Sequence, residues 1–121
     1  MSVSPLEILA DAQTLRVNLV SSEARRRSIL SRTYYAAFHQ AISIAGENGF
    51  RREKNGEGIH QQLIGFLRRQ TKSSLRQLGC DLDSLYTKRI QADYYLNITI
   101  EKHDAEDSLL VAQEVLAAAD D

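Results

Sequence analysis

Residues that break helices are scarce in this chain and are unevenly placed. A single proline, Pro5, and six glycines occur among 121 residues, and four of the glycines fall within residues 46–58. A β-rich domain would need turn-forming residues roughly every 8–12 positions. The distribution therefore predicts long helices joined in one place by a glycine-rich loop, residues 46–58.

The first half of the chain predicts two helices, because apolar residues recur there at intervals of three and four. Ser4 is placed to cap the first helix, which we expect over about 5–22, with Pro5 at its first position. The second is expected over about 22–45, and Gly46 is expected to end it. Its alanines allow close approach of a neighbour, so we expect this helix to be central.

The middle of the chain predicts two further helices with an ambiguous boundary. A third helix begins at about Ile59 and either breaks near Ser73 or ends at Gly79. Either Asp81 or Asp83 is then placed to cap a fourth helix.

The last segment predicts a short link and one more helix. Asn97 to Ile100 is rich in β-branched residues, which indicates an extended connection. Asp104 then opens a helix with an acidic first turn, where the helix dipole favours negative charge. The predicted fold is all-α, with five helices in an up-and-down antiparallel bundle.

Composition predicts a single globular domain over residues 1–121. The chain is 43% hydrophobic and 26% charged, and no apolar run approaches the roughly 18 residues of a membrane helix. Glu7 and Asp11 interrupt the stretch where a secretory signal would be apolar. We therefore expect a cytoplasmic protein without a membrane segment. Cys80 is the only cysteine, which excludes a disulfide within the chain and a cysteine-rich zinc site.

Charge is distributed unevenly although the formal net charge is only −1. Residues 51–100 hold nine Lys or Arg against five Asp or Glu, whereas residues 101–121 hold one against seven. A basic face with phosphate contacts is one interpretation, and an ordinary solvated helix surface is the other. Any RNA binding would be modest and strongly dependent on salt.

Two polar groups stand out from the apolar helical faces. Arg32, Tyr35 and His39 lie at i, i+3 and i+7, which aligns a cation, a phenol and an imidazole on one helix stripe. Arg89 and Asp93 lie at i, i+4, the spacing of an ion pair within a helix. Each group also has an ordinary structural interpretation, as a salt bridge or as a satisfied core histidine.

Other catalytic and metal-binding patterns are absent from the sequence. His60 and His103 have no partner at metal-ligand spacing, so we expect no metal. The glycine-rich loop does not end in Gly-Lys-Ser/Thr, and no Gly-x-Ser-x-Gly elbow occurs. No cofactor is therefore expected.

Two strings resemble one known family. Residues 31–41, SRTYYAAFHQA, resemble the signature helix of small bacterial and archaeal HEPN domain proteins. Residues 88–94, KRIQADY, resemble the Arg-x-x-Ala-Asp-Tyr element of the same group. The resemblance extends more loosely through His60, which opens helix three, and through Ala105 to Ala112, and so covers nearly the whole chain.

The resemblance implies a helical bundle that dimerises, with polar residues of both subunits meeting in a cleft. Many such proteins are metal-independent endoribonucleases of toxin–antitoxin systems, encoded beside a minimal nucleotidyltransferase that acts as antitoxin. They cleave RNA through its 2′-hydroxyl, with a histidine that moves the proton and an arginine that steadies the phosphate, roles that suit imidazole and guanidinium.

Carried onto this sequence, the resemblance makes Arg32, His39 and Arg89 the catalytic candidates. His39 would shuttle the proton, and the two arginines would bind phosphate. RNA or a nucleotide would further contact three residues by stacking or hydrogen bonds: Tyr35, Asp93 and Tyr94.

One departure from the family pattern keeps two alternatives open. The nuclease motif has a histidine four to six residues after its arginine, and Tyr94 occupies that position after Arg89. This favours a catalytically degenerate HEPN module that binds a nucleotide or a nucleotidyltransferase partner, with Tyr94 or Tyr95 as the phenol that accepts adenylate. A structural dimer whose polar cleft only fixes helix register is the third interpretation.

Overall fold

The computed structural model describes residues 4–19 and 22–118, and within these ranges the chain is helical without any strand. The predicted all-α fold with five helices is confirmed. The helices are α1 (Pro5–Leu19), α2 (Glu23–Glu47), α3 (Ile59–Arg68), α4 (Ser73–Tyr94) and α5 (Lys102–Ala118).

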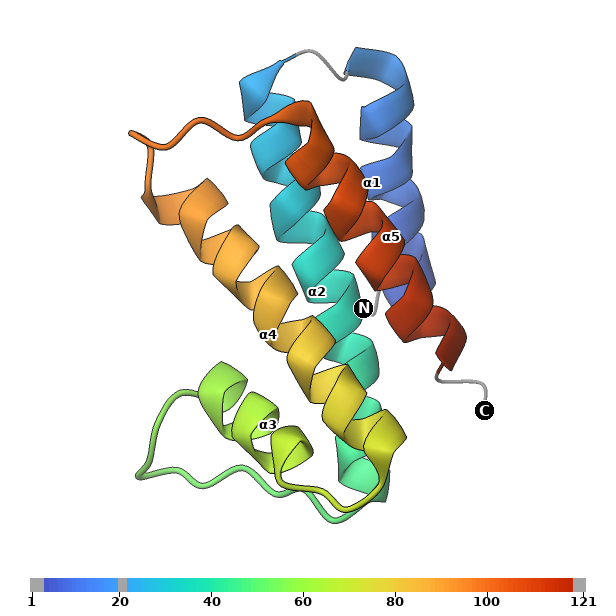
Figure 1. Cartoon of the computed structure of the whole chain (residues 1–121), viewed down its shortest axis with the longest axis vertical. Helices are drawn as coiled ribbons and strands as arrows, with labels where there is room; N and C mark the ends of the chain where they lie inside the picture. The colour runs from blue at the N-terminus through green and yellow to red at the C-terminus, as the bar shows by residue number, and fades with distance from the viewer. Residues whose placement is uncertain (1–3, 20–21, 119–121) are drawn as a thin grey trace.

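The four long helices alternate in direction along the sequence, as Figure 1 shows. α2 lies at the centre and packs against α1, α4 and α5, while the short α3 packs mainly on α4. The central position of α2 follows from its small residues, because buried alanines let neighbouring helices approach its backbone. These fully buried alanines are Ala36, Ala37, Ala41 and Ala45.

Both ends of α2 differ slightly from the prediction. Ser22 is its N-cap, and the Ser22 hydroxyl accepts a hydrogen bond from the Arg25 amide at 3.4 Å. The first helix was expected to reach residue 22, but α1 ends at Leu19, and residues 20 and 21 lie outside the described ranges. α2 continues through Gly46 to Glu47, because the left-handed turn falls three residues later, at Gly49, with a φ of 96°.

The boundary between the third and fourth helices corrects the sequence analysis. The break near Ser73 is confirmed, but α4 starts there and not at Asp81 or Asp83. Gly79 ends no helix; it lies inside α4, where α3 comes closest. A Cβ at Gly79 would be 2.9 Å from Arg68 Cγ, so glycine is required for packing and not for a turn.

Arginines at the start of α2 hold the connection between α4 and α5. The Arg27 guanidinium donates to the carbonyl groups of Gln91 at 3.1 Å and Ala92 at 2.9 Å, near the end of α4. The Arg26 Nε donates to the Ile100 carbonyl at 2.7 Å. Arg27 therefore caps the Ala92 carbonyl, which the end of α4 leaves without a partner in the helix, and Arg26 holds the link before α5.

The start of α5 lies two residues before the expected position. Asp104 sits in its first turn and accepts a hydrogen bond from the Glu101 amide at 2.9 Å. Lys88 of α4 donates to the other Asp104 oxygen at 2.9 Å. Burial alone would raise the pKa of Asp104, but hydrogen bonds from Lys88 and Glu101 hold it below its ordinary value. The acidic first turn therefore also fastens α5 to α4.

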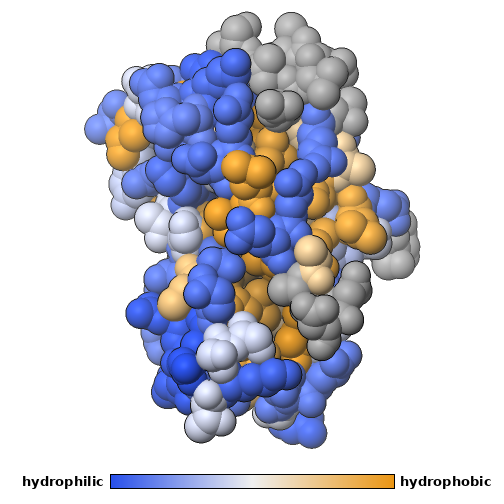
Figure 2. Space-filling model, turned by 45° about the vertical axis from the view of Figure 1, so that its right-hand side comes forward, coloured by the Kyte–Doolittle hydropathy of each residue, from blue (hydrophilic) through white to orange (hydrophobic). Residues whose placement is uncertain are grey.

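Apolar surface is visible between polar rows on the side that α1 and α5 form (Figure 2). Among the side chains that the structure describes, Leu6 of α1 and Leu110 of α5 are large apolar residues exposed to solvent. Leu9 and Leu116 line a hollow of about 340 Å³ between the same helices. None of the described helices combines the length and apolar character needed to cross a membrane.

The contact at Gly79 predicts a steric cost for a single methyl group. We expect Gly79→Ala to lower the free energy of unfolding by about 1–3 kcal/mol, because Arg68 and the α3 backbone must move. Gly46→Ala is the matched control, since no atom lies within 4 Å of its Cβ position. Gly46→Ala should raise the free energy of unfolding by about 0.5–1 kcal/mol, because alanine lowers the conformational entropy of the unfolded chain. Chemical denaturation measures both, and an unchanged Gly79→Ala protein would contradict the close packing.

Candidate functional site

Arg89 is the centre of a polar cluster between α2 and α4. Its Nε donates to Asp93 at 2.8 Å, which confirms the ion pair expected from the i, i+4 spacing. Its Nη2 donates to the Tyr35 hydroxyl of α2 at 2.9 Å. The guanidinium carbon lies 5.2 Å from the Tyr35 ring centre and 5.7 Å from that of Tyr94. The side chain is 13% exposed, so Arg89 is a fixed and largely buried cation.

The surroundings of Arg89 keep it charged. Burial opposes the charge, but Tyr35, Asp93 and Tyr94 more than compensate, and the pKa of Arg89 rises above its ordinary value. Asp93 also accepts a hydrogen bond from the Ser31 hydroxyl at 3.4 Å. Two residues of α2 and three of α4 thus form one network. Two N–H groups of the Arg89 guanidinium donate to Asp93 and Tyr35, and its other N–H groups have no hydrogen-bond partner among the described residues.

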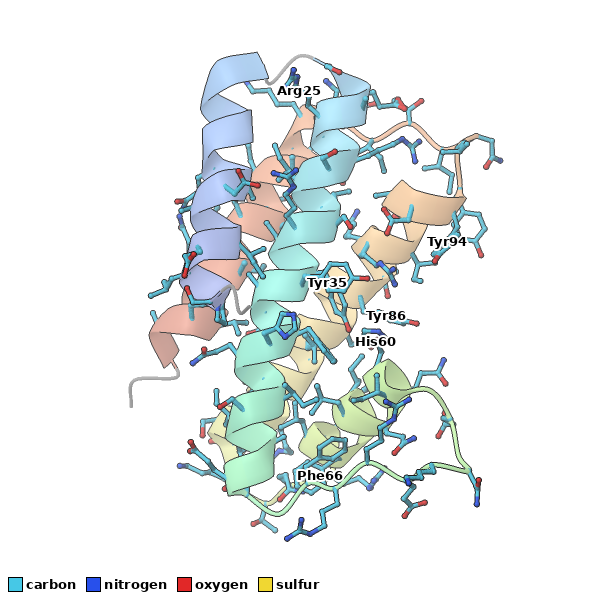
Figure 3. All side chains as sticks on the ribbon, turned by 180° about the vertical axis from the view of Figure 1, so that it is seen from behind. Arg25, Tyr35, His60, Phe66, Tyr86 and Tyr94 are labelled. Carbon is cyan, nitrogen blue, oxygen red and sulfur yellow. The ribbon has the colours of Figure 1, made fainter. Side chains whose placement is uncertain are left out.

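An aromatic cage lies beside the arginine cluster and holds His60. The His60 Nδ1 and the Tyr34 hydroxyl are hydrogen-bonded. The imidazole stacks on Tyr86 with ring centres 5.3 Å apart and an angle of 19°, and Phe38 lies at 4.7 Å. Figure 3 shows His60 and Tyr86 close together below Tyr35. The first residues of α3 are therefore anchored to both α2 and α4.

Burial and nearby cations control the protonation of this cage. The pKa of His60 is lowered by burial and then by the positive charges of Arg89 and Arg52. The pKa of Tyr34 is raised, chiefly by burial. At neutral pH the cage therefore contains a neutral imidazole and a protonated phenol. Arg52 comes from the glycine-rich loop, so this loop contributes charge to the site.

The predicted stripe on α2 is only partly gathered into the cluster. Tyr35 reaches Arg89, but Arg32 is ion-paired with Asp11 of α1. His39 is exposed, and its ring lies 5.5 Å from that of Phe38. Among the described contacts, neither Arg32 nor His39 touches Arg89. The stripe spans two helical turns, and its members face different neighbours because α1 and α4 pack on opposite sides of α2.

The two tyrosines at the end of α4 are accessible. Tyr94 is 65% exposed although its ring faces Arg89, and Tyr95, the C-cap of α4, is 50% exposed. Leu96 and Ile98 follow them and are also exposed. This segment therefore presents two phenols beside apolar side chains.

The glycine-rich loop encloses a hollow of about 620 Å³ against α3. Arg51, Phe66 and Arg69 are among the residues that line it. Gln62 holds the loop in place, because its side chain accepts from the Glu53 amide at 2.8 Å and donates to the Glu53 carbonyl at 2.9 Å. Gln62 of α3 therefore fixes the position of the loop. Within residues 4–19 and 22–118, no three His, Cys, Asp or Glu side chains are arranged to hold a metal ion.

Comparison with protein families finds one matching family. The family model described as "HEPN domain" matches residues 10–121. The chain belongs to the HEPN family. Comparison with curated proteins and with solved structures gives no significant match.

Sequence reasoning about this HEPN chain found the arginine cluster but missed the cage. Arg89, Asp93 and Tyr35 were selected by spacing and by resemblance, and they are in contact. His60 was considered as a metal ligand and as part of the looser family resemblance, without a role in the site, and Tyr86 was not singled out. The signal for both was a polar ring on an otherwise apolar helical face, but only the packing of α3 shows which partners they meet.

The electrostatic coupling between Arg89 and His60 can be measured directly. We expect Arg89→Met to raise the pKa of His60, because a cation that disfavours imidazolium is removed; burial keeps the value below that of a free histidine. Titration of the His60 ring protons by NMR measures the change. Lys102→Met, which removes a cation at the start of α5, is the control. An unchanged pKa in Arg89→Met would mean that the two groups are not coupled.

Proposed function

We propose that this HEPN protein is a metal-independent endoribonuclease that cleaves RNA through the 2′-hydroxyl, with the scissile phosphate bound at Arg89. The observation that carries the proposal is the fixed position of Arg89, which Asp93 and Tyr35 hold in place. The reaction needs a cation that binds the phosphate and a group that accepts a proton, and Arg89 would supply the first.

The geometry of Arg89 suits phosphate binding. Its planar guanidinium can donate two parallel hydrogen bonds to phosphate oxygens, and Asp93 and Tyr35 engage only part of its N–H groups. Because the side chain is already fixed, little conformational entropy is lost when phosphate binds. The Tyr35 and Tyr94 rings, which lie beside the guanidinium, offer faces on which a base can stack.

The remaining candidates from the sequence are kept as parts of this proposal. His39 is a candidate for moving the proton, and Arg32 for a second phosphate contact. Both lie on α2 and are at least partly exposed, so they are accessible from solvent or from a second copy of the chain. We propose a homodimer in which polar residues of both copies meet.

Removing the Arg89 charge tests the proposed ribonuclease. We expect Arg89→Met to lower the rate of RNA cleavage about 10²-fold or more, since one charged group that stabilises the transition state is lost. Purified protein is incubated with single-stranded RNA in EDTA, and new 2′,3′-cyclic phosphate ends are measured. Lys102→Met removes the same charge on the exposed side of α5 and should retain activity. Equal rates for Arg89→Met and wild type would contradict the assignment.

A second function is favoured by the exposed phenols. Tyr94 occupies the position of the motif histidine, and Tyr94 and Tyr95 are both accessible. We propose as the alternative that the protein binds a nucleotide or a minimal nucleotidyltransferase antitoxin. The transferase would join adenylate to a phenol: the tyrosine oxygen attacks the α-phosphorus of ATP, its proton goes to solvent, and pyrophosphate leaves.

Coexpression tests this alternative. We expect the protein coexpressed with a minimal nucleotidyltransferase and isolated intact to gain the mass of one adenylate, because both tyrosines are at least half exposed. Tyr94→Phe, Tyr95→Phe and the double variant locate the modified oxygen by mass spectrometry. Tyr86→Phe is the control, because that ring is packed against His60. A mass gain that persists in the double variant would exclude both tyrosines.

A further inference from the structure

We infer that the hollow between the glycine-rich loop and α3 is a separate binding site for a nucleotide, with the phosphate at Arg51 and Arg69. The hollow measures about 620 Å³, which lies within the range of pockets that hold small ligands. None of its lining residues belongs to the Arg89 cluster or to the aromatic cage. The inference therefore goes beyond the proposed function and does not depend on RNA cleavage.

Two phenylalanines give the hollow an aromatic surface. Phe50 of the loop and Phe66 of α3 meet edge to face, with ring centres 5.3 Å apart and an angle of 60°. Both residues are half-buried and both line the hollow. In Figure 3, Phe66 lies below His60 and Tyr35, toward the far end of α3. An accessible aromatic ring is a platform on which a base can stack.

Two arginines line the same hollow with unpaired guanidinium groups. Arg51 comes from the loop, Arg69 is the C-cap of α3, and both residues are exposed. Among the residues that the structure describes, neither guanidinium has a hydrogen-bond or ion-pair partner. Other arginines of the chain do bond to protein groups: Arg27, Arg32, Arg68, Arg76 and Arg89. Each unpaired guanidinium can donate two parallel hydrogen bonds to phosphate oxygens.

Gly65 makes room for the Arg69 side chain at the hollow. This glycine lies inside α3, where it is less favourable than alanine for helix stability. A Cβ at Gly65 would lie 3.0 Å from Arg69 Nη1, which is tighter than an ordinary contact. The missing side chain therefore allows the Arg69 guanidinium to fold back along the helix, and both residues line the hollow.

The other end of the hollow carries acidic residues. Gln62 binds the backbone of Glu53 at 2.8 and 2.9 Å and also donates to the Glu57 carbonyl, which holds both residues beside the first half of α3. Arg69 follows Gln62 by about 10 Å along the helix, with Phe66 between them. The hollow is therefore polarised, with carboxylates at one end and a cation at the other.

A nucleotide matches this polarity better than a smaller ligand does. Its phosphate is an anion for the arginines, and its flat base can stack on an aromatic ring. Carboxylate oxygens accept hydrogen bonds and do not donate them, so the acidic end suits the amino groups of guanine, adenine or cytosine. Inorganic phosphate would leave the acidic end unused, and a nucleoside would leave the arginines unpaired. The same chemical unit occurs free and within an RNA strand.

Titration with GMP tests the phosphate end of the site. We expect GMP to bind and to shift the NMR signals of Phe66 and of the Gly65 amide. Arg69→Met should weaken binding about tenfold or more, because a charged donor to the phosphate is lost. Arg68→Met is the matched control, since it removes the same charge one residue away, where the guanidinium faces Asp83. It should keep the wild-type affinity, and circular dichroism checks that each variant is folded.

Three results of this titration would overturn the inference. The first is that GMP does not bind, and the second is that folded Arg69→Met binds it as well as wild type does. The third is that Arg89→Met abolishes binding while Arg69→Met does not, which would place the phosphate at the Arg89 cluster. GMP is not cleaved, so these results leave the proposed ribonuclease untouched. Loss of RNA cleavage in Arg89→Met likewise leaves the inferred site untouched.

Gly65→Ala separates the position of Arg69 from its charge. The added methyl group must displace the Arg69 guanidinium, which is the end of a flexible side chain, so the fold should be kept. We expect GMP binding to fall about fivefold or more without a lower temperature of unfolding, because the phosphate loses a positioned donor. Wild-type affinity in Gly65→Ala would contradict the placement of the phosphate at Arg69.

A comparison of GMP with UMP tests the acidic end. Guanine carries an amino group that uracil lacks, while the phosphate and the ribose are the same. We expect GMP to bind about fivefold more tightly than UMP, and the double variant Glu53→Gln, Glu57→Gln to reduce that preference. Equal binding of the two nucleotides by wild type would overturn the assignment of the base to the acidic end.

A single-stranded probe distinguishes a free nucleotide from a unit of RNA. A 2′-deoxy pentanucleotide with one guanine among thymines has the same bases and phosphates at hand but cannot be cleaved through a 2′-hydroxyl. If it binds about tenfold more tightly than GMP and Arg69→Met weakens both, the hollow takes a unit of a strand. If only GMP shifts the Phe66 signals, the hollow takes a free nucleotide. Equally tight binding of an all-thymine pentanucleotide would overturn recognition of the base.

Discussion

The fold and the candidate site both depend on the hydrogen bond between the buried Tyr34 and His60. A tyrosine that is fully buried needs a partner for its hydroxyl, since an unpaired polar group in the core is costly. Here that partner is His60, so the requirement for one hydrogen bond draws the start of α3 onto α2. Tyr86 packs against both rings and brings α4 to the same place. Three helices therefore meet at one hydrogen bond surrounded by aromatic rings.

Arg89 connects this packing contact to the charged groups of the candidate site. Its guanidinium joins α4 to α2 through Tyr35, the residue next to Tyr34, and it lowers the pKa of His60 nearby. The same arrangement thus stabilises the bundle and sets the charge state of the site. Arg27 supports it from a distance, because it holds the carbonyl groups that follow Arg89 near the end of α4. Few of these contacts are local in sequence, which is why they were hard to predict.

Helix content and family were predictable because they depend on short-range patterns. The scarcity of proline, the spacing of apolar residues and two sequence strings were enough for an all-α HEPN bundle, which the family match confirms. The boundaries were less predictable. Gly46 was expected to end a helix and Gly79 was one of two alternatives for a helix end. Gly46 lies inside α2 with no atom near its Cβ position, and Gly79 lies inside α4, where it leaves room for α3. The sequence does not distinguish a glycine that ends a helix from one that allows two helices to pack closely.

The sequence by itself determined which chemical groups the chain carries and which of them share a helix. It placed Arg89 and Asp93 one turn apart, and their ion pair follows from helix geometry alone. Only the tertiary structure decided which groups meet across helices: Tyr35 joins Arg89, Arg32 turns to Asp11, and His60 enters a cage. The physical reason is that helix periodicity fixes the direction in which each side chain points from the axis of its own helix. Its partners are fixed by how neighbouring helices pack, and that depends on the whole core.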